Sequence, residues 1–265
     1  CFQIAECSFA SAKILQKSEI TKRFAIFFIL SPIFSCEIKI FVVSLQKDSV
    51  TKRSVMDKQI NELLEVLKEY QELGISEQID YQKFYLYSII THSTAIEGST
   101  VTEIENQLLF DEGITAKGKP MVEQLMNLDL KRAYEQSIRW AREHKPFTVE
   151  MLKNLSALVM RNTGSHYSTL MGEFDSSKGD LRLVGVTAGA GGRSYMDYRK
   201  VPMKLEELCN HINQRREALI KSPNAIDAYL LSFDAHNILV TIHPWVDGNG
   251  RMSRLIMNHL QFEFG

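Results

Sequence analysis

The sequence has no excess of charge of either sign and few cysteines. Its 265 residues include 31 Lys or Arg and 32 Asp or Glu, which gives a formal net charge of −1. Without an overall field, nucleic acid or an anionic membrane would have to be bound by a local basic cluster. The four cysteines, at positions 1, 7, 36 and 209, show neither metal-ligand spacing nor a disulfide framework. We therefore expect a reduced, cytoplasmic environment.

Uninterrupted hydrophobic runs of membrane-spanning length are also lacking. A spanning helix needs roughly 20 predominantly apolar residues, and the apolar segment 24–45 contains Pro32, Glu37 and Lys39. No leader of the secretory type, internal repeat or low-complexity tract is visible in the sequence. We predict that the chain does not enter a membrane.

The chain divides into a lead segment and two helical regions. It begins at Cys1, and its first methionine is Met56. We interpret residues 1–55 as a lead segment that is disordered or non-native, and residues 56–145 as an N-terminal helical region. Residues 146–265 form the expected core domain. Its helical pattern is still running at the last residue, which indicates a core truncated at its C-terminal end.

Apolar residues recur at helical spacing through most of the chain after Met56, which predicts a mainly α fold. Thr102 and Glu105 fit a capping box, Thr148 is a cap residue, and Pro120 suits a first helical position. The helices predicted in this way are 57–73, 79–96, 102–110, 120–144, 148–161, one opened by Pro202, one from Pro223 toward His243, and one after the loop that follows.

The pattern changes between residues 163 and 198, where glycine is frequent. Residues 181–186 and 194–198 have the character of short strands on either side of a Gly/Ala turn at 188–193. We predict a β-hairpin, or flap, at this place in an otherwise helical protein.

A polar loop lies between two helical patterns at residues 243–254, HPWVDGNGRMSR. Gly248 and Gly250 let the backbone turn tightly and bring its N–H groups close to an anion. The N-terminus of the following helix adds partial positive charge. Arg251 and Arg254 are three residues apart, so both can lie on one helix face and grip neighbouring phosphate oxygens. The loop therefore predicts a phosphate site.

Two further residues of the loop have the chemistry of a catalytic site. Asp247 is a candidate Mg²⁺ ligand, because Mg²⁺ often combines one or two protein carboxylates with phosphate oxygens; the alternative is an Asx-turn residue that shapes the loop. His243 precedes a proline, which favours an extended backbone. Its ordinary pKa near 6.5 suits a general base, and the alternative is a structural histidine.

Glu97 ends a predicted helix, followed by Gly98 at a position that suits glycine. A carboxylate there faces the negative end of the helix dipole, which is mildly unfavourable. Either Glu97 is simply solvated, or it has a cationic partner elsewhere in the fold.

The loop closely resembles the signature HxFx(D/E)GNGRxxR of Fic-domain adenylyltransferases. Trp245 replaces the usual phenylalanine, and we expect this large aromatic to anchor the loop in the core. The resemblance extends more loosely over residues 146–265, including the Gly-Asp-Leu-Arg segment at 179–182. It implies a Fic-type helical bundle with a small β-hairpin flap beside the active-site loop. Upstream, residues 93–98 fit the family's inhibitory motif (S/T)xxxE(G/N).

The resemblance implies transfer of AMP from ATP to a Ser, Thr or Tyr hydroxyl of a protein substrate. In this scheme His243 deprotonates the hydroxyl and Asp247 holds Mg²⁺. The residues expected to bind ATP and its phosphates are Asp247, Gly248, Asn249, Gly250, Arg251, Met252, Ser253 and Arg254.

The resemblance also implies self-inhibition and a docking site for the target. Ser93, Glu97 and Gly98 form the inhibitory motif, in which Glu97 pairs with Arg254 and blocks the γ-phosphate position. The flap would dock a target segment by strand addition. Its expected residues are Ser194, Tyr195, Met196, Asp197 and Tyr198.

Several alternatives stay open at this point. A related branch of the fold phosphorylates its targets and carries lysine in place of Gly250, so glycine favours nucleotidyl transfer. Uridylyl or phosphocholine transfer, and removal of AMP with Glu97 positioning water, are further alternatives. The chain could instead be a non-catalytic regulatory module. In that case nucleic acid would be bound through a C-terminal domain absent from this sequence. A homodimer is also left open.

Overall fold

Helices make up most of the residues that the computed structural model describes, which are 65, 68–69, 72, 81–189 and 191–264. The chain divides into two units, Cys1–Gln82 and Lys83–Gly265. The contacts described below lie within the second unit. The expected lead segment 1–55 and most of the predicted helix 57–73 lie outside the described residues.

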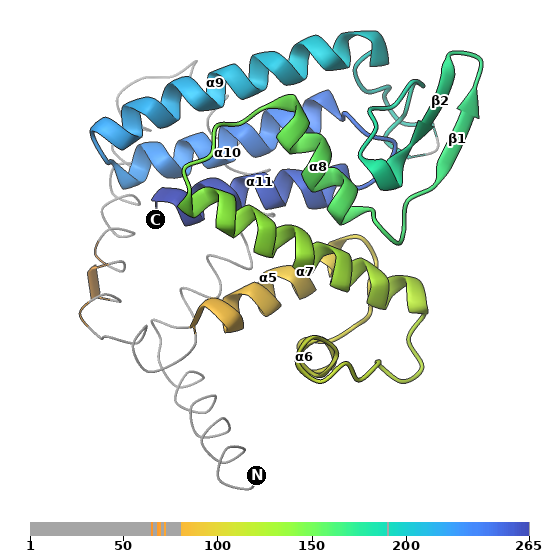
Figure 1. The fold of residues 1–265 in the computed structure, drawn as a ribbon, viewed down its shortest axis with the longest axis horizontal. Helices are drawn as coiled ribbons and strands as arrows, with labels where there is room; N and C mark the ends of the chain where they lie inside the picture. The colour runs from red at the N-terminus through yellow and green to blue at the C-terminus, as the bar shows by residue number, and fades with distance from the viewer. Residues whose placement is uncertain (1–64, 66–67, 70–71, 73–80, 190, 265) are drawn as a thin grey trace, which may run out of the picture. The chain divides into compact units, whose positions relative to one another are not determined.

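The mainly α prediction is confirmed (Figure 1). Each predicted helix after residue 80 is present, within a few residues of its expected bounds. The helices are α5 (Tyr81–Ile96), α6 (Glu103–Asp111), α7 (Met121–Arg142), α8 (Val149–Val159), α9 (Val201–Lys221), α10 (Ala225–Ile242) and α11 (Asn249–Phe264).

Helix α11 is the centre of the hydrophobic core. It packs against α10, α7 and α8, and α9 lies along α10 (Figure 1). Every residue from 251 to 260 is buried. Leu255, Ile256 and Leu260 have no exposed surface and join the core formed by the surrounding helices. Since α11 is enclosed along most of its length, the loop before it is held in a fixed place.

Local capping residues begin several helices as predicted. Thr102 and Glu105 form a reciprocal capping box at α6, and Thr148 accepts a hydrogen bond from a backbone N–H in the first turn of α8. Pro120 differs by one position, since it is the residue before α7 rather than the first helical residue. Asn224 caps α10 by accepting from two backbone N–H groups.

The two-stranded sheet is not where the sequence pattern placed it. Strands β1 (His166–Thr169) and β2 (Gly172–Asp175) pair antiparallel. Tyr167 lies opposite Phe174, and their rings stack with centroids 4.9 Å apart. A mainly helical fold with one small sheet is confirmed, but this hairpin precedes the predicted one.

The predicted strands 181–186 and 194–198 are wrong. This stretch, called the flap segment below (residues 181–198), does fold back on itself, with an isolated bridge between Thr187 and Ser194. Tyr198 begins a short 3-10 helix, η2 (Tyr198–Lys200), and another, η1 (Ser176–Lys178), follows β2. The carbonyls of Val184 and Met196 accept hydrogen bonds from the Arg182 guanidinium.

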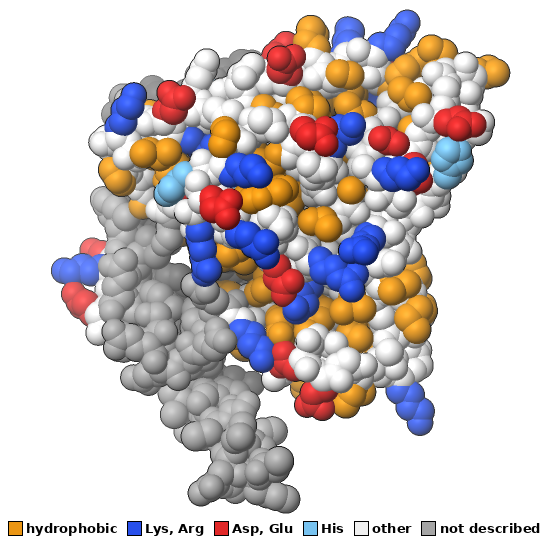
Figure 2. Space-filling view, in the orientation of Figure 1, with side chains coloured by type: hydrophobic (Ala, Val, Ile, Leu, Met, Phe, Trp, Pro, Cys, Tyr) orange, Lys and Arg blue, Asp and Glu red, His pale blue; other side chains and the backbone are white. Residues whose placement is uncertain are grey.

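The surface shown in Figure 2 carries Lys and Arg interspersed with Asp and Glu. This face has no large field of one sign, in keeping with the formal net charge of −1.

No helix in the part of the chain that the structure describes is long and apolar enough to cross a membrane.

A buried histidine in α11 makes stability depend on pH. His259 is fully buried, and burial together with the charge of Arg216 lowers its pKa to about 3. The unfolded chain takes up this proton near pH 6.5, while the folded chain does not until about pH 3. The free energy of unfolding should therefore fall as pH drops from about 6.5 toward 3. Urea unfolding at several pH values should show a shallower fall for His259→Leu, and an unchanged fall would contradict the assignment.

Candidate active site

Trp245 anchors the loop between α10 and α11, as its aromatic character predicts. The side chain is fully buried, and its indole N–H donates to the carbonyl of Gly179 at 3.1 Å. The amide of Asn249 accepts from Trp245 N at 3.1 Å and donates to Trp245 O at 2.9 Å. Asn249 therefore uses its side chain to shape the loop. At this site its backbone can contribute to anion binding.

His243 ends α10 in the left-handed conformation, with φ 52° and ψ 63°. The expected extended backbone is wrong, although Pro244 does keep His243 out of the right-handed helical region. The left-handed conformation instead caps the helix, since the His243 N–H donates to Leu239 O at 2.9 Å. The sharp exit turns the chain into the loop.

The imidazole of His243 is half-buried and covered by an aromatic ring. The ring of Tyr195, from the flap segment, stacks on it with centroids 3.6 Å apart and planes 17° apart. Nδ1 lies 3.4 Å from Val240 O, which favours a proton on Nδ1 and leaves Nε2 able to accept one. Desolvation lowers the pKa of His243, and the charge of Arg182 adds to this, against opposite effects from Val240 and Asp247.

Asp247 has the loop-shaping contact of an Asx-turn residue, and its carboxylate also faces solvent. One carboxylate oxygen accepts from the N–H of Gly248 at 2.6 Å, which shapes the turn. The side chain is nevertheless 64% exposed, and its other oxygen lies 3.7 Å from the Arg251 guanidinium. Gly248 has φ 78°, and an added Cβ would press against Met160. The glycine is therefore required both by the turn and by the space.

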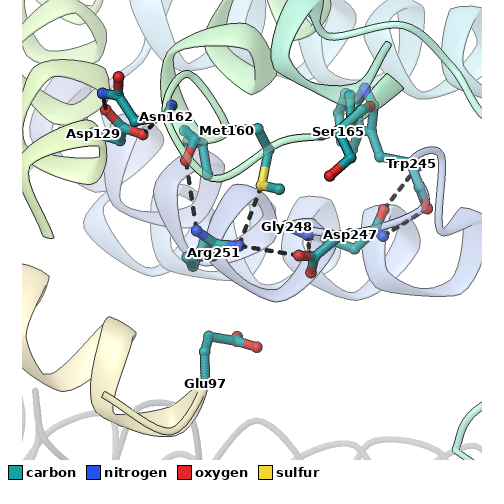
Figure 3. Close-up of polar contacts among 12 residues, drawn as sticks. Glu97, Asp129, Met160, Asn162, Ser165, Trp245, Asp247, Gly248 and Arg251 are labelled. Atoms are coloured by element: carbon teal, nitrogen blue, oxygen red, sulfur yellow. Dashed lines mark hydrogen bonds and ion pairs between the residues drawn. The ribbon is translucent and has the colours of Figure 1, made fainter. Parts of the chain in front are cut away.

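Arg251 is buried with incomplete hydrogen bonding (Figure 3). Its guanidinium lies 3.2 Å from Met160 Sδ and 3.5 Å from Val159 O. Nε is a buried donor without a partner among the described residues. Buried donors are rarely left unpaired in proteins. Near the first turn of α11, beside the carboxylate of Asp247, such a donor is suited to a bound phosphate oxygen.

Arg254 is directed toward α5 instead. Its Nε donates to Ser93 Oγ at 2.8 Å, and a terminal nitrogen donates to Ser93 O at 3.0 Å. The same nitrogen forms an ion pair with Glu97 Oε1. Glu97 thus has the cationic partner that its place at the helix end suggested. Gly98 has φ 96°, as its predicted position after the helix requires.

Gly250 leaves the space that this ion pair occupies. A Cβ built at Gly250 would meet the Glu97 carboxylate and the Arg254 guanidinium. The structure therefore brings Glu97, Gly250 and Arg254 together as the sequence motifs predict. The two arginines of the loop do not share one target, because Arg251 contacts α8 and Arg254 contacts α5.

Other expected site residues have structural surroundings. Met252 is part of the hydrophobic core, and the hydroxyl of Ser253 donates to Gly250 O at 2.9 Å. In the flap segment, Met196 packs against the core, and Ser194 is exposed. Asp197 caps η2, and hydrogen bonds from Arg199 lower its pKa to about 2.

A buried polar network that the sequence motifs do not predict ties α5 to α6 and α7. Asn127 Oδ1 accepts from Thr94 Oγ1 at 2.7 Å and from Asn106 Nδ2 at 2.9 Å. All three side chains are fully buried. The available signal was a pair of asparagines within helical segments, where their propensity is low. This network fixes the helix that leads to Glu97.

Among the described residues, no group of three or more His, Cys, Asp or Glu side chains is arranged to hold a metal ion. A Mg²⁺ ion at this site would have the exposed carboxylate of Asp247 as its protein ligand and would need phosphate oxygens and water for the rest. That donor set fits a metal that arrives with a nucleotide.

Residues 146–261 match the family model described as the Fic/DOC family. The helical architecture described above agrees with this match in that part of the chain. The solved structure of a Fic domain-containing signalling protein from Bacteroides thetaiotaomicron has a TM-score of 0.55 at 21% identity, covering 70% of this chain and 67% of that chain. A Fic family protein from Desulfovibrio desulfuricans G20 has a TM-score of 0.55 at 19% identity, covering 81% and 58%.

Curated relatives share the domain at low identity. Protein adenylyltransferase fic-1 of Caenorhabditis briggsae is 23% identical over 186 residues, which are 69% of this chain and 33% of that protein. A Fido domain-containing protein of Dictyostelium discoideum is 37% identical over 76 residues, which are 29% of this chain and 50% of that protein. The chain thus spans about a third of the length of the Caenorhabditis relative.

The hydrogen bond from the indole N–H of Trp245 should contribute to the free energy of unfolding beyond the burial of the ring. Trp245→Phe would leave the Gly179 carbonyl without its donor and open a small cavity, which should lower the free energy of unfolding by about 2 kcal/mol. Urea unfolding measures this loss. Trp140→Phe, at a half-buried tryptophan beside Lys145, is the matched control and should cost less. Equal losses would contradict an anchoring role for Trp245.

Proposed function

We propose that this protein transfers AMP from ATP to a hydroxyl group of a protein substrate. The observation that carries the proposal is the loop at residues 243–254. A half-buried histidine, an exposed aspartate and an arginine with an unpaired buried donor meet at the N-terminus of α11. The loop lies within the part of the chain that matches the Fic/DOC family. The name protein adenylyltransferase of relatives such as fic-1 of Caenorhabditis briggsae supports the choice of reaction.

The proposed reaction uses His243 as the general base. Nε2 accepts the proton of the attacking hydroxyl, whose oxygen forms a bond to the α-phosphorus of ATP. The bond from that phosphorus to the oxygen bridging the β-phosphate breaks, and pyrophosphate leaves. Tyr195 restricts the orientation of the imidazole and shields one face from water. The positive end of α11 and the Arg251 guanidinium stabilise the charge that develops on the phosphate oxygens.

Asp247 would hold Mg²⁺, which when bound neutralises phosphate charge. The carboxylate is exposed enough to bind a metal and is fixed in direction by its bond to Gly248 N. The fit of the donor set and the unpaired Nε of Arg251 both favour a triphosphate with its metal over a metal alone.

We further propose that the protein restrains itself through Glu97. The carboxylate occupies Arg254, the second arginine of the loop, and Ser93 takes two more of its donors. A γ-phosphate that needs Arg254 must therefore displace Glu97. The ion pair is only partly exposed, with the Arg254 side chain 9% accessible, so this competition is not fully screened by water.

Glu97→Gly should increase the rate of AMP transfer by about tenfold or more. A tenfold change corresponds to roughly 1.4 kcal/mol of binding free energy that ATP no longer spends in displacing Glu97. The measurement is incorporation of label from [α-³²P]ATP with Mg²⁺, onto the protein itself or an added protein. Glu97→Gly combined with His243→Ala should carry no label. Glu112→Gly, which removes an exposed carboxylate at the end of α6, is the control and should behave as the wild type.

The alternatives give different results in the same assay. Label from [γ-³²P]ATP would indicate phosphorylation, and label from [α-³²P]UTP alone would indicate uridylyl transfer. Loss of AMP from a premodified protein, with water as the acceptor, would indicate AMP removal. A folded Glu97→Gly protein with no label from any nucleotide would count against an enzyme and favour a binding module.

The transfer rate should persist into mildly acidic solution. The base is active when neutral, and burial lowers the pKa of His243 from its ordinary 6.5. Protonation, and with it the loss of activity, therefore sets in at lower pH than for an exposed histidine. The acid limb of kcat/KM for ATP in Glu97→Gly should have its midpoint below 6.5. A midpoint at or above 6.5 would contradict the assignment of His243 as the base.

A further inference from the structure

Arg182 is a buried guanidinium between the catalytic loop and the flap segment. Only 1% of the surface of Arg182 is exposed to solvent. Nε donates to the carbonyl of His243 at 2.7 Å, and one terminal nitrogen donates to Val184 O at 2.7 Å. The other terminal nitrogen donates to Met196 O and lies 3.5 Å from Ile242 O. One side chain thus bonds to backbone on both sides of the site.

The charge of Arg182 is compensated by backbone carbonyls. Among the described residues no carboxylate forms an ion pair with it, although Asp197 acts on it at longer range. Desolvation of the buried guanidinium lowers the pKa of Arg182, and the distant charge of Asp197 opposes this effect. Buried charges are costly unless they are hydrogen-bonded, and well-packed apolar residues often stabilise a core as well or better. The contribution of Arg182 to folding stability therefore does not account for an arginine at this place. Its hydrogen bonds, which fix the positions of four backbone carbonyls, do.

The carbonyl at His243 belongs to a strained part of the backbone. A left-handed residue with a side chain costs about 1–2 kcal/mol and persists when its surroundings fix it. Arg182 supplies two such restraints, since its backbone N–H also donates to Pro244 O at 3.1 Å. The direction of the His243 side chain follows from that backbone conformation.

The contacts of Arg182 with the flap segment also affect the His243 imidazole, through Tyr195. The carbonyl of Met196 follows Tyr195 directly, and the N–H of Tyr195 donates to Val186 O at 3.0 Å. The Tyr195 ring stacks on His243. Holding Val184 and Met196 therefore holds the ring that covers the base.

We propose that Arg182 is a positioning residue for the transfer reaction. Its guanidinium fixes His243 in the left-handed conformation and fixes the flap segment so that Tyr195 lies on the imidazole. The proposal rests on the proposed function for its kinetic consequence, but its structural part stands on the contacts alone. Because these contacts need a planar group with several divergent donors, lysine cannot replace arginine here.

The test compares Arg182→Lys with Arg216→Lys, both made in the Glu97→Gly protein. Arg216 is the matched control, because it is also buried but pairs with Glu263 on α11, away from the loop. We expect kcat for Arg182→Lys to fall by about 10–100-fold, as a misplaced base requires, with little change in KM for ATP. Arg216→Lys should leave kcat unchanged even if it is less stable.

Two measurements do not depend on activity. The upfield ring-current shift that Tyr195 gives the His243 imidazole protons should shrink in Arg182→Lys and persist in Arg216→Lys. Hydrogen exchange at the Tyr195 amide should quicken in Arg182→Lys alone. If Arg182→Lys does not fold, Arg182→Gln is measured in the same way.

The outcomes separate the two proposals. An unchanged ring-current shift and unchanged exchange in Arg182→Lys would overturn the positioning role, as would kcat equal to that of Arg216→Lys. Absence of transfer in the Glu97→Gly parent would instead defeat the proposed function. In that case the ring-current shift and the exchange rate still decide whether Arg182 holds His243 and Tyr195.

Discussion

The buried charge of Arg254 is the constraint on which the site depends. Its side chain is 9% exposed, and a guanidinium in such a place needs acceptors. In this structure Ser93 of α5 and Glu97, the residue that follows α5, supply them. Gly250 leaves room for the carboxylate because it has no side chain. In the proposed function a triphosphate offers the same arginine a different anion, so that Glu97 and the γ-phosphate compete for it.

The surrounding helices and the flap segment fix the position of the loop at residues 243–254. Helix α11 is enclosed by α10, α7 and α8, and Trp245 and Asn249 bond the turn that precedes it. Arg182 holds the backbone of His243, and the flap segment places Tyr195 on the imidazole. His243 and the turn before α11 are thus fixed by burial and hydrogen bonds, while the Glu97 carboxylate is paired with the Arg254 guanidinium.

Much of this arrangement could be predicted from the sequence, because its signals are local. The capping box of Thr102 and Glu105, the cap at Thr148 and the glycine at position 98 each act within a few residues, and the structure has all of them. The predicted flap strands are absent, and in this stretch Arg182 bonds to the carbonyls of Val184 and Met196, a side-chain contact that no pattern of period two reveals. The following proline predicts an extended backbone at His243. The observed left-handed state depends on the end of α10 and on a guanidinium 61 positions away, which a local pattern does not show.

The most direct test of the account is the position of the Arg254 side chain when nucleotide is present. Crystal structures of the wild-type and Glu97→Gly proteins with ATP and Mg²⁺ would show it. The account predicts that in Glu97→Gly the γ-phosphate contacts Arg254 and the α- and β-phosphates lie at the N-terminus of α11. A wild-type structure in which the γ-phosphate contacts Arg254 while the Glu97 ion pair is intact would contradict it, as would a triphosphate bound away from α11.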